Sequence, residues 1–211
     1  VMDLGFARWF ASCAHSLHTL EIRNKHLEDP AVLAQWLHTC TSLTRLDLYG
    51  VNASNLMWLQ KSTDALVHLD LTNCSGLANL EELASLAAQG LPNLHFLGVS
   101  LDKNPPIASL VEVGQHCTQL QHLTVASLHA KGRVKQIEVG QLLATFRQIT
   151  TLELRCCQNV SFALVNFIPQ MCPNLTQVML CSPKQMWAQS PWLTEAQLNY
   201  IQATYPRIDF K

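Results

Sequence analysis

Nine histidines and eight cysteines are the residues of this 211-residue chain that could bind a metal ion or act as nucleophiles. Their spacing does not match such chemistry, since the sequence contains no CxxC, no HExxH and no glycine-rich phosphate loop. The vicinal pair Cys156 and Cys157 could be redox-active, but Cys157 occupies a position that a sequence repeat specifies. We therefore predict that the chain is not an enzyme and holds no cofactor and no metal ion.

The composition is that of a folded protein without a charged binding surface. Hydrophobic residues make up 48% of the chain and charged residues 14%, with a net charge of −1. Nucleic acids and membrane surfaces attract basic faces, so this balance argues against both as partners. No apolar run reaches the roughly 18 residues of a membrane helix, and the first residues do not resemble a signal peptide.

The elements that must position any functional residue are sequence repeats. Each copy has an aliphatic residue, two variable residues, a second aliphatic, one variable residue and a third aliphatic. The copies begin at Leu17, Leu43, Leu66, Leu94, Leu120, Ile149 and Leu175, and an eighth begins at Ile208. The first seven follow one another at steps of 23 to 29 residues, which is the period of leucine-rich repeats.

The repeated phrase predicts a short strand, because alternation places its second and third aliphatic residues on one face. One such strand cannot bury its apolar face alone, so the copies must stack in parallel with helical crossovers. We predict an α/β leucine-rich-repeat solenoid, a horseshoe of about seven repeats with a concave parallel sheet and convex helices. Helix starts are predicted at Asp29–Pro30, at Asn79 with Glu82 in a capping box, at Ser161 and at Thr194 with Gln197.

The cysteines follow the repeats. Cys13, Cys40, Cys117 and Cys172 each precede the phrase by three or four residues, whereas Cys74 and Cys157 follow the strand. Cys74 and Cys157 are three repeats apart, about 14 Å, which exceeds the reach of a disulfide. Free, packed thiols favour a reducing intracellular compartment, most simply the cytoplasm, with a mitochondrial or axonemal location as the alternative.

At these cysteines the sequence resembles a known class of repeat. The segments at Cys40–Leu43, Cys117–Leu120, Cys172–Leu175 and Leu69–Leu77 resemble the cysteine-containing leucine-rich repeats of F-box/LRR receptors, a ribonuclease-inhibitor-like class. The resemblance covers residues 13 to 181 and implies the substrate-recognition solenoid of an SCF-type ubiquitin ligase. Asp102 and Leu128 depart from the cysteine pattern, and the 211 residues contain no F-box. A structural scaffold subunit of a large axonemal or mitochondrial assembly is the alternative.

Function in such a fold belongs to concave positions. The candidate protein-binding residues there are Glu21, Arg23, Arg45, Asp47, Tyr49, His68, Asp70, Phe96, His122, Glu153 and Arg155. Glu21, Asp47 and Asp70 form an acid ladder with rungs about 5 Å apart. This ladder is either a solvated charged face or a site for a cationic partner segment. Phe96 stands among small residues and predicts a shallow apolar depression.

Two long loops and both chain ends complete the candidates. Residues 129–138 are interpreted as a solvated basic loop. Trp187 and Trp192 lie in the loop 181–193, which either caps the last repeat or contacts a partner. Residues 1–211 form a single predicted domain of a longer chain or assembly, with ends that lack a polar cap and offer a second partner surface. No small-molecule substrate is expected.

Four N-x-S/T sequons occur, at Asn52, Asn73, Asn159 and Asn174. They indicate either a glycosylated ectodomain or asparagines that serve the repeat turns. We favour the turns because the cysteine-bounded caps of extracellular repeats are missing.

The thiol assignment gives the first prediction. All eight cysteines should react with a thiol reagent under denaturing, non-reducing conditions, and a reductant should leave the melting temperature unchanged. Intact-mass analysis after alkylation is the measurement. Two or more disulfides would contradict the reducing compartment.

Overall fold

The computed structural model describes residues 10, 12–23, 37–52, 56, 59, 63–75, 80–101, 107–127, 142–155, 161–181 and 193–211. Within these residues, eight strands form one parallel sheet whose order follows the sequence. The strands are β1 (Thr19–Arg23), β2 (Arg45–Asn52), β3 (His68–Ser75), β4 (Phe96–Leu101), β5 (His122–Ser127), β6 (Thr151–Arg155), β7 (Gln177–Cys181) and β8 (Asp209–Phe210).

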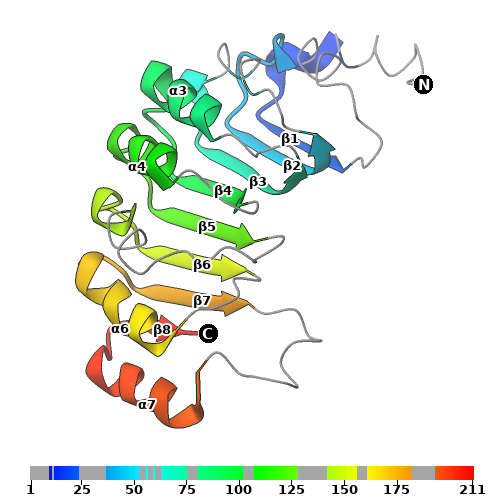
Figure 1. The fold of residues 1–211 in the computed structure, drawn as a ribbon. Coiled ribbons are helices and arrows are strands. Elements are labelled where there is room, and N and C mark those ends of the chain that lie inside the picture. Colours follow the sequence, from blue (N-terminus) through cyan, green and yellow to red (C-terminus); the bar gives the residue numbers. More distant parts are fainter. Residues whose placement is uncertain are drawn as a thin grey trace.

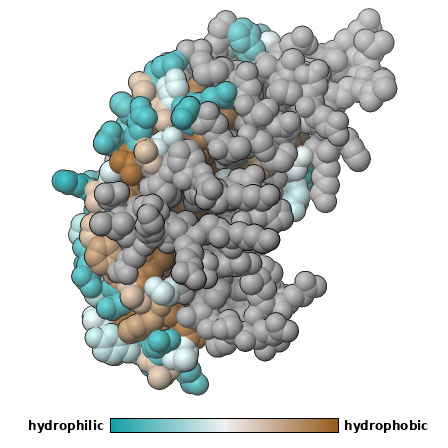
Figure 2. Space-filling view, in the orientation of Figure 1, coloured by the Kyte–Doolittle hydropathy of each residue, from teal (hydrophilic) through white to brown (hydrophobic). Residues whose placement is uncertain are grey.

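The helices lie on one side of the sheet, along the outside of its curve (Figure 1). Those whose bounds the structure describes are α3 (Glu81–Gly90), α4 (Ile107–His116), α6 (Phe162–Met171) and α7 (Glu195–Thr204), with the short 3-10 turns η1 (Ala14–Ser16) and η3 (Thr63–Ala65). Hydrophilic residues are spread along this outer rim (Figure 2). Among the described residues, no helix is long and apolar enough to cross a membrane.

The parallel sheet, with helices along the outside of its curve, confirms the predicted α/β leucine-rich-repeat solenoid, including the eighth strand.

The core is a column of aliphatic side chains between the sheet and the helices. The second aliphatic residue of each inner repeat is fully or almost fully buried; these residues are Leu46, Leu69, Leu97, Leu123, Leu152 and Val178. Leu20, in the first strand, is only partly buried against the same core. The second aliphatic residue is thus fully buried only where a strand lies on each side of its own.

Backbone hydrogen bonds tie each strand entrance to the repeat before it. The His18 carbonyl accepts from the N–H groups of both Thr44 and Arg45 at 2.9 Å. The same arrangement recurs at every junction from β2 to β7, and at β8 the Asp209 N–H donates to the Thr176 carbonyl at 2.8 Å. Each repeat therefore enters the sheet at the same height, which fixes the register.

Two predicted helix starts are confirmed. The Ser161 side chain accepts a hydrogen bond from the Leu164 N–H at 3.1 Å, capping α6. At α7, Thr194 and Gln197 form a reciprocal capping box, with distances of 3.2 Å and 2.9 Å. These caps satisfy backbone N–H groups that a helix leaves unpaired at its start. The predicted start at Asp29–Pro30 lies outside the described residues.

The capping box predicted for Glu82 is wrong. Helix α3 is preceded by Leu80 at the cap position, without a side-chain cap. The Glu82 carboxylate instead accepts a hydrogen bond from the Leu56 N–H of the preceding repeat at 2.6 Å. A buried backbone N–H needs a partner, and this carboxylate supplies one across the gap between repeats. Gly90 ends the helix, in a backbone conformation with φ of 150° that favours glycine.

The cysteines are packed thiols where the structure describes them. The six described cysteines are thiols outside disulfides, as predicted for them; Cys156 and Cys157 lie outside the described residues. The Cys74 thiol donates to the Leu48 carbonyl of the previous strand at 3.3 Å. Burial raises the pKa of the Cys74 thiol, and likewise those of Cys117 and Cys172, to about 12. These groups are neutral packing residues.

Asparagines at one turn position join neighbouring repeats. The Asn93 amide donates to the Asp64 carbonyl at 2.8 Å, and the Asn174 amide donates to the Arg147 carbonyl at 3.0 Å. Asn174 belongs to one of the four sequons, so its hydrogen bonding supports the interpretation of that sequon as a turn.

The column of aliphatic residues gives a prediction about stability. Leu123→Ala should lower the free energy of unfolding by about 2–5 kcal/mol, because the cavity lies in a fully buried layer. Leu20→Ala removes the same type of side chain at the same repeat position in β1, where the leucine is only partly buried. It should lower the free energy of unfolding by clearly less. Urea denaturation followed by circular dichroism measures both. Equal losses would show that burial does not differ between these repeats.

Candidate functional site: the concave face of the sheet

The predicted concave residues lie in aligned rows. Thr19, Arg45, His68, Phe96, His122, Thr151 and Gln177 are consecutive partners in one row. Glu21, Asp47, Asp70, Gly98, Thr124, Glu153 and Met179 form the next row. The alignment of both rows confirms the register that the repeats predict. Trp187 and Trp192, predicted in the loop before α7, lie outside the described residues.

The acid ladder exists, but arginines of the same strands accompany it. Glu21 and Asp47 are register partners, as are Asp47 and Asp70. Arg23 pairs with Glu21, and two nitrogens of Arg45 donate to Oδ2 of Asp47 at 2.8 and 3.0 Å. These pairs span two residues along one strand, where side chains share a face. The arginines therefore relieve part of the repulsion between the neighbouring acids.

A β-bulge changes the row beyond the ladder. Tyr49 is the register partner of Asn73, whereas the repeats predict Thr72, because β3 holds one extra residue between Asp70 and Asn73. The Thr72 N–H donates to Oδ1 of Asp70 at 2.9 Å. The bulge thus fixes the position of the Asp70 carboxylate.

The depression predicted beside Phe96 is not open at its centre. A side chain at Gly98 would meet Oδ1 of Asp70 at 2.5 Å and a Thr72 methyl group at 2.8 Å. The carboxylate of Asp70 therefore occupies the space above Gly98, and only glycine leaves room for it. Ser100, Thr124 and Ala126, the other small residues of the predicted depression, are buried.

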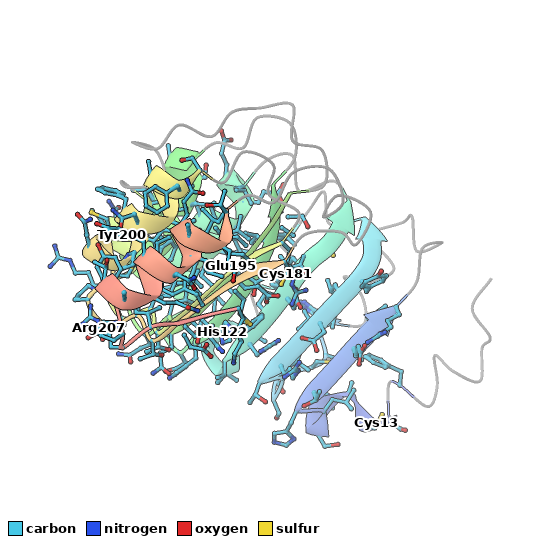
Figure 3. The ribbon with its side chains drawn as sticks, turned by 90° about the horizontal axis from the view of Figure 1, so that it is seen from below. Cys13, His122, Cys181, Glu195, Tyr200 and Arg207 are labelled. Atoms are coloured by element: carbon cyan, nitrogen blue, oxygen red, sulfur yellow. The ribbon has the colours of Figure 1, made fainter. Side chains whose placement is uncertain are left out.

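Three rings form a continuous row beside the acids. The His68 and Phe96 rings stack with centroids 3.9 Å apart and planes 12° apart. The His122 ring, labelled in Figure 3, packs on the other side of Phe96 at 5.0 Å. Burial lowers the pKa of His68, with help from the Arg45 charge and against the charges of Asp47 and Asp70. Burial also lowers the pKa of His122, so both imidazoles are neutral at pH 7.

His68 also belongs to a cluster that sequence reasoning missed. From the sequence, His68 and His122 predict no metal site because they lie two strands apart. The structure instead brings one ligand atom each of Asp47, His68 and Asp70 within 4.8 Å of one another. The signal was present in the spacing of His68 and Asp70, two residues apart on one strand face, and in the register that sets Asp47 beside them.

Glu153 and Arg155 form a separate, more buried network. The Glu153 side chain accepts hydrogen bonds from Arg155 at 2.7 and 2.9 Å, from the Thr124 hydroxyl at 3.1 Å and from the Cys181 thiol at 3.4 Å. The residue is only 8% exposed. Burial by itself raises the pKa of Glu153, but the hydrogen bonds and charge of Arg155 outweigh it and hold that pKa below its ordinary value of 4.5. This pair belongs to the internal structure of the concave face.

A comparison with protein-family models finds no match. A comparison with curated proteins also finds none. Among solved structures, the chain is similar to internalin C2 from Listeria monocytogenes, with 16% sequence identity over 85% of this chain and 79% of that one, at a TM-score of 0.42. The class of this protein follows from its own repeats and sheet: it is a leucine-rich-repeat solenoid.

The Glu153 network gives a prediction about pH. A carboxyl group whose pKa is lowered by folding stabilises the protein above its ordinary pKa, and that contribution is lost as the pH falls through the folded value. Glu153→Gln should therefore be less stable than the wild type at pH 7, and the difference should shrink below pH 4.5. Urea denaturation across this range is the measurement. A difference that does not change with pH would show that Glu153 is not stabilised by ionisation.

Proposed function

We propose that this protein is an interaction module that binds a partner protein through the N-terminal half of its concave face. The observation that supports this proposal is that side chains in the N-terminal half of the face are more exposed than those in the C-terminal half. Tyr49 is 44% exposed and the Arg23 side chain 74%, whereas Thr124 and Glu153 are buried. Accessible aromatic and arginine side chains are the residues that most often dominate protein interfaces.

The chemistry of this half favours a partner segment that carries cations. Three acids, Glu21, Asp47 and Asp70, accompany two arginines, Arg23 and Arg45, while His68 is neutral at pH 7. The net charge of this set is −1. Because Arg23 is largely exposed, a lysine or arginine of the partner could replace it beside Glu21 without unfolding the sheet.

The finer proposal is that the chain is the recognition solenoid of an F-box/LRR ubiquitin-ligase receptor inside the cell. It is supported by the cysteine positions that the sequence shares with that class. Cys40, Cys117 and Cys172 are buried thiols at equivalent places before β2, β5 and β7. The alternative is a fixed scaffold subunit of a large assembly, for which the same packing would serve.

Affinity purification with matched variants tests the binding face. Tyr49→Ala should lower the affinity for a captured partner at least tenfold, since it removes the exposed aromatic side chain of the face. Tyr200→Ala, on α7 and 55% exposed, is the control on the outer side and should bind as the wild type does (Figure 3). Biolayer interferometry measures both. Equal losses, or none in the concave variant, would contradict the proposed face.

Salt dependence tests the charge of the partner. If the partner segment is cationic, its affinity for the wild type should fall as ionic strength rises, and Glu21→Gln should flatten that dependence. Unchanged affinity between low and high salt would leave the face without an electrostatic role.

Co-purification from the source cells distinguishes the ubiquitin-ligase receptor from the scaffold subunit. A ligase receptor should carry the subunits of an SCF-type ligase core in stoichiometric amount, and the partner should accumulate when the receptor is depleted. A scaffold should instead sediment with one large assembly, and its loss should disperse that assembly.

A further inference from the structure

We propose that Asp47, His68 and Asp70 form a site for a divalent transition-metal ion, best suited to Zn²⁺ by its donor set. Metal binding is proposed separately from partner binding, and Asp47 and Asp70 belong to both sites. It lies between β2 and β3, and its three ligand atoms are within 4.8 Å of one another. Two atoms that are each about 2 Å from one ion lie at most about 4 Å apart, so the side chains of the cluster must move together by up to about 1 Å when the ion binds.

Two of the atoms have no other role in the described structure. Oδ1 of Asp47 and Nε2 of His68 lie 2.8 Å apart. Both atoms are buried, and apart from their contact with each other neither has a hydrogen-bond partner among the described residues. Buried polar atoms are nearly always satisfied, so such a pair needs an explanation. A shared metal ion supplies one, because it would accept a lone pair from each atom.

The surroundings hold the ligands in place. Arg45 occupies Oδ2 of Asp47, which turns Oδ1 toward the site. The Thr72 N–H donates to Oδ1 of Asp70 and leaves the second oxygen of that carboxylate for the metal ion. Stacking on Phe96 fixes the plane of the His68 ring. Partners of this kind, one on each ligand, are the usual support of protein metal sites.

Charge and donor type select the ion. Two carboxylates and one arginine give the site a net charge of −1, and a neutral imidazole is the form that binds metal. One nitrogen and two oxygens suit Zn²⁺ and its neighbours better than Ca²⁺ or Mg²⁺, which prefer oxygen alone. Three protein ligands leave a coordination position for water or for a partner group.

Cobalt titration of the reduced, chelator-treated chain tests the site. Co²⁺ reports its ligands by absorption, so a site of nitrogen and oxygen is distinguished from one made by the cysteines. The wild type should bind one Co²⁺ without a thiolate charge-transfer band, and Zn²⁺ should displace it. Asp70→Asn should weaken Co²⁺ binding at least tenfold, and it retains the acceptor for the Thr72 N–H, so the fold should persist.

His68→Gln is the second variant and should also weaken binding at least tenfold. His18→Gln and Asp209→Asn are the matched controls; both residues are exposed and stand outside the cluster, and both variants should bind as the wild type does. Circular dichroism melts check that each variant is folded. Unchanged affinity in Asp70→Asn, or a thiolate band in the wild type, would overturn the proposal. Because the probe is the metal alone, this outcome is separate from that of the partner-binding experiments.

Discussion

The burial of one repeat by the next is the constraint on which the structure depends. The aliphatic residues of a single strand, such as Leu97 in β4, have a hydrocarbon environment only because β3 and β5 lie on either side. The shared carbonyl at each strand entrance sets the height at which neighbours meet. Glu82 and Asn174 add side-chain bonds between repeats. Stability is therefore a sum of contacts between neighbours, without one central core.

This constraint also determines the chemistry of the concave face. Parallel strands lie about 4.8 Å apart, so equivalent side chains of neighbouring strands are close together. Like charges at this distance repel unless each has an oppositely charged partner, and neighbouring rings come into contact. The acids respond by pairing with arginines two residues away, as Asp47 does with Arg45. The rings respond by stacking, as His68 does on Phe96. The concave face is thus a set of local pairs, and a ligand must replace some of them.

The two halves of the face differ in how complete these pairs are. At β6, Glu153 has Arg155, Thr124 and Cys181 as partners and is buried. Between β2 and β3, the bulge interrupts the regular pairing, and Oδ1 of Asp47 has only the close approach of His68. Unsatisfied polar groups are a common mark of functional positions. The same irregularity lies in the N-terminal half of the face, where we propose that both the protein partner and the metal ion bind.

The sequence alone determined the repeats, the strand order, the rows of concave residues and the free state of the six described cysteines. It could do so because each depends on a short local pattern that recurs at a fixed period. The tertiary structure alone decided which neighbours a side chain finds across the strands. It placed Asp47 beside His68, the Asp70 carboxylate above Gly98 and the Glu82 carboxylate beside the Leu56 N–H. Each of these contacts joins residues of different repeats. The physical reason is that such contacts depend on side-chain conformation and on packing between repeats, which a periodic pattern along the chain does not specify. The extra residue in β3 beyond Asp70 is a further departure that no periodic pattern predicts.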